Sequence, residues 1–230
     1  MEPIKYLKDM LGVTEGTIVD TAIDIGLSAA PTIGQMYQSY QIKKLEKRMN
    51  AHESHFQVIK DKIEKKENDV FYKQEVFPLI VKQLMNEDQD EKAKVIIDGF
   101  EYVIDNDLNE IERIYHYYDV LSELRYSDIL MLIEDYMPYE MRKNLTLNIK
   151  LPTEEELRSS EYQEGETIKT YQKNKMVRLG LLENRVVNVD GGDFNDEGKM
   201  SLIEEKIVIT PFGINFLIFF GLEDTEEEQD

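Results

Sequence analysis

One stretch of the chain, residues 42 to 63, constrains the fold more than any other. Positions spaced three and four residues apart lie on one narrow face of a helix there, as in a coiled coil. We call this face the interaction seam; it comprises Ile42, Leu45, Met49, His52, Phe56, Ile59 and Ile63. The pattern predicts one long helix over about 34–67, along which other helices, a protein partner or a second copy would pack.

The composition excludes several classes of protein. Among 230 residues there are 47 acidic and 27 basic ones, a formal charge of −20, which opposes binding to the polyanionic surface of nucleic acid. The chain has no cysteine, so disulfides, thiolate nucleophiles and cysteine-ligated metals are excluded. Because the N-terminus has no signal-like apolar run either, we expect a cytoplasmic protein.

Apolar periodicity predicts a mainly α fold in two parts. Residues 1–150 read as a helical bundle around the long helix, with further helices between 70 and 136. Residues 151–222 read as a small winged-helix-like α+β unit: a helix over 165–179, a two-strand hairpin, and a closing helix after Thr210-Pro211. The acidic tail, 223–230, is expected to be disordered.

The segment 18–33 is apolar and is followed by the basic cluster KKLEKR, residues 43–48. Asp20, Asp24 and Pro31 argue against a membrane span, which needs about 20 apolar residues. The segment is therefore predicted to be an amphipathic helix that packs on the bundle. A basic cluster beside an apolar helix is also typical of contact with a membrane surface, so a membrane-associated effector stays an alternative.

Two motifs carry a family resemblance: RLGLLE at 178–183 and VITPFGINFLIFF at 208–220. With the apolar segment broken by proline and glycine at 27–34, they resemble uncharacterised helical proteins of bacteria and phages of the Abi-alpha-like type, some associated with abortive infection. The resemblance implies a role in conflict between bacteria and phages, either in defence or in anti-defence. It implies no catalytic residues.

Neither an active site nor a cofactor site is predicted. The phosphate-binding glycine motifs and the GxSxG motif are absent from the sequence. His52 and His55 are three residues apart, but a zinc site needs three or four protein ligands and His116 is the only other histidine. We therefore expect no enzyme activity, no cofactor and no metal.

A winged-helix transcriptional regulator is the main alternative function. Four cations lie on the predicted helix before the hairpin: Lys169, Lys173, Lys175 and Arg178. The loop between the strands, the wing, is acidic instead, with Asp190, Asp193, Asp196 and Glu197. DNA-binding wings need cations, so no specific nucleic-acid binding is expected. The leading hypothesis is a protein-interaction module that binds a partner through the long helix or the acidic surface, in one version by imitating DNA.

Overall fold

The structure is a computed structural model that describes residues 31–138, 141, 159–190 and 201–222. The chain forms two compact units. Unit 1 comprises Met1–Tyr126 and Phe219–Gly221, and unit 2 comprises Ser127–Ile218 and Leu222–Asp230. The described chain is mostly helical with one small antiparallel sheet, as the sequence predicts. The chain passes from unit 1 to unit 2 at 126/127. The division predicted at 150/151 lies outside the described residues.

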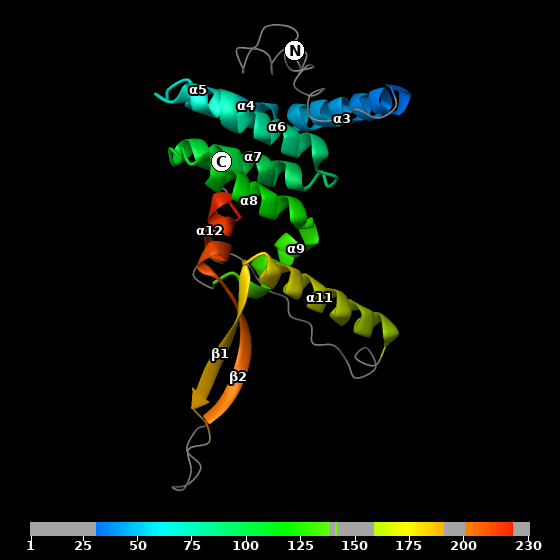
Figure 1. Cartoon of the computed structure of the whole chain (residues 1–230), viewed down its shortest axis with the longest axis vertical. Coiled ribbons are helices and arrows are strands. Elements are labelled where there is room, and N and C mark those ends of the chain that lie inside the picture. Colours follow the sequence, from blue (N-terminus) through cyan, green and yellow to red (C-terminus); the bar gives the residue numbers. More distant parts are fainter. Residues whose placement is uncertain (1–30, 139–140, 142–158, 191–200, 223–230) are drawn as a thin grey trace, which may run out of the picture. The chain divides into compact units, whose positions relative to one another are not determined.

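Unit 1 is a layered array of helices. The elements are α3 (Pro31–Ala51), α4 (Glu53–Ile63), α5 (Asp69–Phe71), the π-helix η1 (Tyr72–Val76), α6 (Phe77–Asn86), α7 (Lys92–Asp105) and α8 (Ile111–Glu123). Helix α3 packs on α6, whereas α4 and α6 both pack on α7. Figure 1 shows α4, α7 and α8 following one another side by side.

The predicted long helix is two helices, which corrects the sequence prediction. Residue His52 interrupts it with φ −120° and ψ 26°, and its N–H lies 3.2 Å from the carbonyl oxygens of both Arg48 and Met49. The physical reason is that the two halves pack on different partners, α3 on α6 and α4 on α7. Neither glycine nor proline marks the break.

Aromatic side chains form the core of unit 1. The Phe56 ring meets Phe77 edge to face at 6.5 Å between centroids, and Phe77 lies 5.8 Å from Phe100. Near the C-terminus, Phe219 stacks on Tyr117 with centroids 4.3 Å apart. These rings are buried, so the chain's C-terminal aromatics complete the core of the N-terminal helices.

Unit 2 joins a short helix pair, a long helix and a hairpin. Its elements are α9 (Tyr126–Met131), the π-helix η2 (Leu132–Tyr136), α11 (Ser160–Arg178), β1 (Leu182–Asp190), β2 (Ser201–Ile209) and α12 (Pro211–Phe219). The strands pair antiparallel from Leu182↔Ile209 to Asp190↔Ser201, and Figure 1 shows them as a long ribbon. Thr210 caps α12 as predicted, because its Oγ1 accepts a 2.9 Å bond from the Gly213 N–H.

Several predicted features lie outside the described residues. They are the segment 18–30, the tail 223–230, and the wing residues Asp193, Asp196 and Glu197. Within the ranges that the structure describes, no helix combines the length and apolar character needed to cross a bilayer.

Candidate functional site

The interaction seam is mainly a packing face inside unit 1. Five of its members are at most 6% exposed: Leu45, Met49, Phe56, Ile59 and Ile63. Ile42 and His52 are half-buried. Burial lowers the pKa of His52, which lies at the break between α3 and α4. A face covered by the chain's own helices is not available to a partner, so the candidate binding surface has to be sought elsewhere.

Three of the four cations of the basic cluster KKLEKR, Lys44, Lys47 and Arg48, are paired within unit 1. Arg48 is 2% exposed; its guanidinium donates to Asp90 Oδ1 at 2.9 Å and to the carbonyl oxygens of Leu84 and Glu87. Lys44 Nζ donates to Asp88 at 3.0 Å, and Lys47 also bonds Asp90. The cluster therefore fixes α3 to the turn between α6 and α7. The structure explains these cations without a membrane surface.

A second cation is buried nearby. Lys92, 1% exposed, donates to the Leu124 carbonyl oxygen at 2.8 Å and forms an ion pair with Glu87. A buried ammonium needs such partners, because an unpaired charge costs several kcal/mol. This side chain joins the start of α7 to the end of α8. Its role is structural.

His55 on α4 lies between two carboxylates. Its Nε2 lies 2.5 Å from Glu101 Oε2 and its Nδ1 lies 3.8 Å from Asp98 Oδ1, both on α7. This hydrogen bond, with a second from Lys62, lowers the pKa of Glu101 to about 2. An ionised carboxylate only accepts, so the bonded Nε2 carries a proton. Both nitrogens thus face carboxylates that hold α4 on α7, which leaves His55 poorly placed as a general base.

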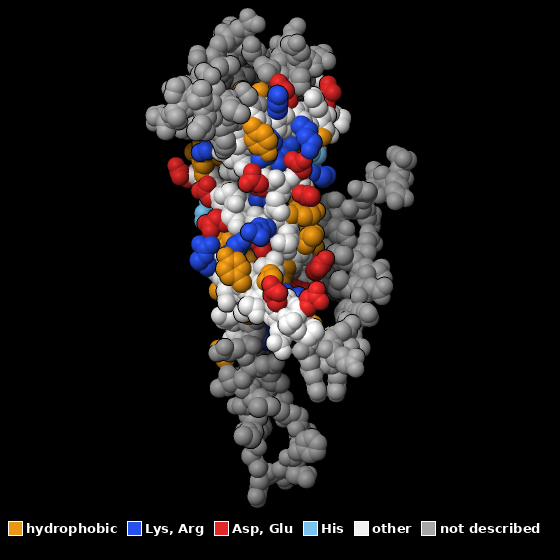
Figure 2. Space-filling view, turned by 90° about the vertical axis from the view of Figure 1, so that its right-hand side faces the viewer, with side chains coloured by type: hydrophobic (Ala, Val, Ile, Leu, Met, Phe, Trp, Pro, Cys, Tyr) orange, Lys and Arg blue, Asp and Glu red, His pale blue; other side chains and the backbone are white. Residues whose placement is uncertain are grey.

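Over the ranges that the structure describes, no group of three or more histidine or acidic side chains is arranged to hold a metal ion. On the face shown in Figure 2, acidic and basic side chains are interspersed rather than gathered by sign. Ion pairs such as Lys44–Asp88 and Lys62–Glu101 use part of the charge of unit 1 to join its segments.

In unit 2 the Asp128 side chain is a buried charge, 1% exposed. It accepts bonds from Lys175 Nζ at 2.7 Å and from Gln172 Nε2 at 2.9 Å, both on α11. This pair explains why the unit begins at Ser127, since α9 is tied to α11 across 47 positions of sequence. It also commits one of the four cations of α11 to the fold.

The two motifs of the family resemblance meet in unit 2. The Thr210 N–H donates to the Leu181 carbonyl oxygen at 3.0 Å, and Thr210 Oγ1 donates to the Gly180 carbonyl oxygen at 2.6 Å. Gly180 has φ +75°, which glycine adopts without a steric penalty. A Cβ on Gly213 would overlap the Leu181 carbonyl oxygen. The glycines and the threonine of both motifs thus build one junction between α11, the hairpin and α12.

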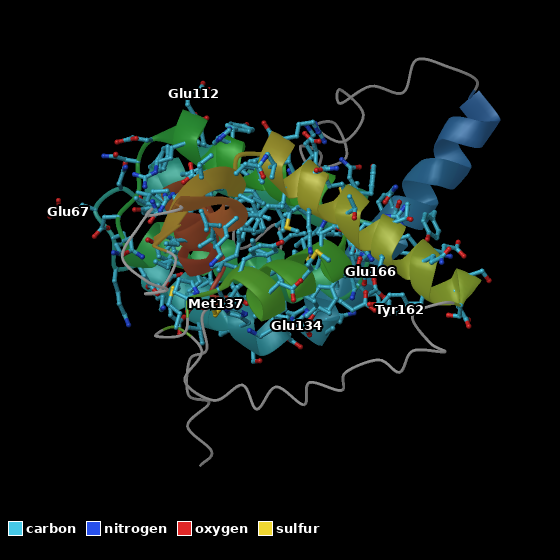
Figure 3. All side chains as sticks on the ribbon, turned by 90° about the horizontal axis from the view of Figure 1, so that it is seen from below. Glu67, Glu112, Glu134, Met137, Tyr162 and Glu166 are labelled. Atoms are coloured by element: carbon cyan, nitrogen blue, oxygen red, sulfur yellow. The ribbon has the colours of Figure 1, made fainter. Side chains whose placement is uncertain are left out.

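Helix α11 in unit 2 is largely exposed. Of its 19 residues only Met176 is buried, while Ile168 and Tyr171 are 53% and 67% exposed. Figures 1 and 3 show its N-terminal half, where Tyr162 and Glu166 are labelled in Figure 3, extending past the helix α9–η2. Ile168 and Tyr171 lie one turn apart, so they share one exposed face of the helix, which we take as the candidate binding surface. This surface was not predicted from the sequence.

The cations on α11 are only partly available to a ligand. Lys169 Nζ lies 3.1 Å from Glu166 on the same helix, and Lys175 binds Asp128. Of the acidic wing, Asp190 is the last residue of β1.

Comparison of the chain with protein families, with curated proteins and with solved structures finds no match.

Proposed function

We propose that the chain is a non-enzymatic protein-binding module that acts in conflict between bacteria and phages, and that it binds through the exposed face of α11. The observation that carries the binding surface is the exposure of Ile168 and Tyr171 on a helix with one buried residue. Tyrosine supplies a large contact area at a low cost in conformational entropy and is enriched in binding hot spots. The role in conflict rests on the resemblance carried by the motifs at 178–183 and 208–220.

Two features support a binding role over catalysis. His55 is held between carboxylates of its own unit, and the buried cations Arg48 and Lys92 are bound to carbonyl oxygens and carboxylates. Each of these groups has a structural role, so we propose none of them as a catalytic residue. No cofactor or metal is part of the proposal.

The experiment is site-specific photo-crosslinking in cells, with and without phage infection. A photoreactive residue replaces Tyr171, and the control replaces Val58, which is 47% exposed on α4. We expect a crosslinked protein, either another protein or a second copy, from position 171 and not from position 58. The captured species is then purified, and its affinity is measured by calorimetry.

In that second step Tyr171→Ala should weaken binding at least about tenfold, as expected for loss of a hot-spot side chain, whereas Val58→Ala should not. Plaquing efficiency should change when the parent chain is expressed and should return to the baseline with Tyr171→Ala. If positions 171 and 58 capture the same proteins, the assignment of the binding surface to α11 is refuted. If expression of the chain leaves plaquing efficiency unchanged, the proposed role in conflict between bacteria and phages is refuted.

A DNA-binding regulator is the second candidate, because α11, the hairpin and α12 follow the order of a winged-helix unit. Lys173 and Arg178 are the cations of α11 to test. A sequence-dependent mobility shift at about 50 mM salt that is lost in Lys173→Ala/Arg178→Ala would favour this candidate. We expect no such shift.

A further inference from the structure

We propose that the partner of the α11 surface is a second copy of the chain, whose α11 packs antiparallel on the first. This inference rests on the proposed function, since it names the occupant of the same surface. It starts from the spacing of one stripe of α11 residues. The stripe comprises Glu161, Glu164, Ile168, Tyr171, Lys175 and Arg178.

These residues are spaced three, four, three, four and three apart, the spacing that lines up one contact face in a coiled coil. The two apolar members lie in the middle and are its most exposed large side chains, Ile168 at 53% and Tyr171 at 67%. Glu161, Glu164 and Arg178 are also exposed. The stripe is therefore a contact face that unit 2 covers mainly at Lys175.

The order of charges selects the occupant. The acidic members lie at the start of the helix and the basic members at its end, so reversing the stripe exchanges their signs. In an antiparallel pair with its twofold axis between residues 169 and 170, Glu161 of one copy faces Arg178 of the other. Ile168 then faces Tyr171. A parallel pair would instead place like charges together, which is unfavourable.

The third pair, Glu164 with Lys175 of the other copy, is weaker by this geometry. Lys175 is 12% exposed and already binds Asp128. Its ammonium has three N–H donors, of which Asp128 accepts one, so a second carboxylate can approach only at its exposed edge. The two apolar contacts therefore carry most of the binding, and the charged pairs set the orientation.

The size of the contact predicts weak association. A 19-residue helix is about 28 Å long, and one helix pair buries less than the roughly 1,600 Å² of a standard protein interface. Dissociation constants in the micromolar range are expected, and higher salt should weaken binding because the outer pairs are exposed.

Sedimentation of the full chain, between about 5 and 200 µM, tests the proposal by charge reversal. Glu161→Lys alone or Arg178→Glu alone should weaken dimerisation roughly tenfold, because each places like charges opposite one another twice in the symmetric pair. An equimolar mixture of the two variants restores both pairs and should dimerise as the parent does. Tyr171→Ala should also weaken dimerisation, and the control Val58→Ala should leave it unchanged.

Cysteine crosslinking tests the orientation, since the chain has no cysteine of its own. Copies with Glu161→Cys and copies with Arg178→Cys should form a mixed disulfide in preference to either symmetric one. A chain that stays monomeric at about 200 µM would overturn the proposal, as would reversal variants that dimerise like the parent. If α11 still captures another protein in the photo-crosslinking experiment, the proposed function stands and only the self-pairing fails.

Discussion

Replacing Phe56 by alanine tests the seam as the core of unit 1. The Phe56 ring is fully buried and meets Phe77 edge to face at 6.5 Å, and Phe77 in turn contacts Phe100. Removing a buried phenylalanine costs about 3 to 5 kcal/mol, through lost transfer free energy and the cavity left behind. Most domains have only about 5 to 15 kcal/mol of folding free energy, so this loss is a large fraction of the total.

The assay is denaturant unfolding followed by circular dichroism, with Val58→Ala as the matched control. Val58 lies two residues away on the same helix and is 47% exposed. Its replacement should change the free energy of unfolding by no more than about 0.5 kcal/mol. The midpoint should fall for Phe56→Ala with an unchanged denaturant slope, since the same surface is exposed on unfolding.

A second readout separates a core from an interface. Because the chain's own helices bury Phe56, a folded Phe56→Ala protein should sediment with the same dependence on concentration as the parent. A loss below about 1 kcal/mol would contradict the packing described for unit 1, because it would match an ordinary surface substitution. If Phe56→Ala changed the oligomeric mass in sedimentation but not the free energy of unfolding, the seam would be an interface between chains and not a core.

Four further outcomes are expected. Lys92→Met should cost about 3 kcal/mol of unfolding free energy, because the buried partners of the ammonium lose their donor. Lys94 is exposed on the same helix, so Lys94→Met should cost under about 1 kcal/mol in the same unfolding assay. Gly213→Ala should destabilise by about 1 to 3 kcal/mol through overlap with backbone, whereas Gly165→Ala, which meets nothing within 4 Å, should stabilise α11 by about 0.5 kcal/mol or more. The pKa of Glu101 is lowered from 4.5 to about 2, so its contribution to stability is fully present above pH 4.5 and is lost as the pH falls toward 2. In the unfolding assay Glu101→Gln should therefore cost less free energy of unfolding at about pH 3 than at about pH 5. Backbone amides of α11 should exchange with solvent faster than those of α7, and those of its N-terminal half should slow with protein concentration, as measured by mass spectrometry.

The sequence predicted the helices of unit 1 well, because their apolar faces repeat at helical spacing. It could not show the break at His52, since the seam spacing continues through it without a glycine or proline. What ends α3 is the change of packing partner from α6 to α7. Such a change depends on contacts between distant segments, which the spacing of one segment does not encode.

The attachment of α9 to α11 and the pairing of the buried cations could not be predicted for a related reason. The bond between Asp128 and Lys175 joins residues 47 positions apart and ties α9 to α11 in unit 2. Likewise, KKLEKR was interpreted as a basic cluster typical of contact with a membrane surface. Only the fold brings the acidic turn with Asp88 and Asp90 to these cations.

The surface of α11 was missed because its stripe holds only two apolar residues between charged ones. A search for apolar periodicity passes over it, yet the same composition suits a weak contact between helices. A 19-residue helix with one buried residue, Met176, gains little from packing within its own unit, and isolated helices of about 12 to 15 residues are marginal in water. Its N-cap bond from the Tyr162 N–H to Ser159 and its attachment to Asp128 secure only parts of its length. The remaining stabilisation is what antiparallel pairing of two copies would supply, at the stripe where the exposed side chains and the order of charges coincide.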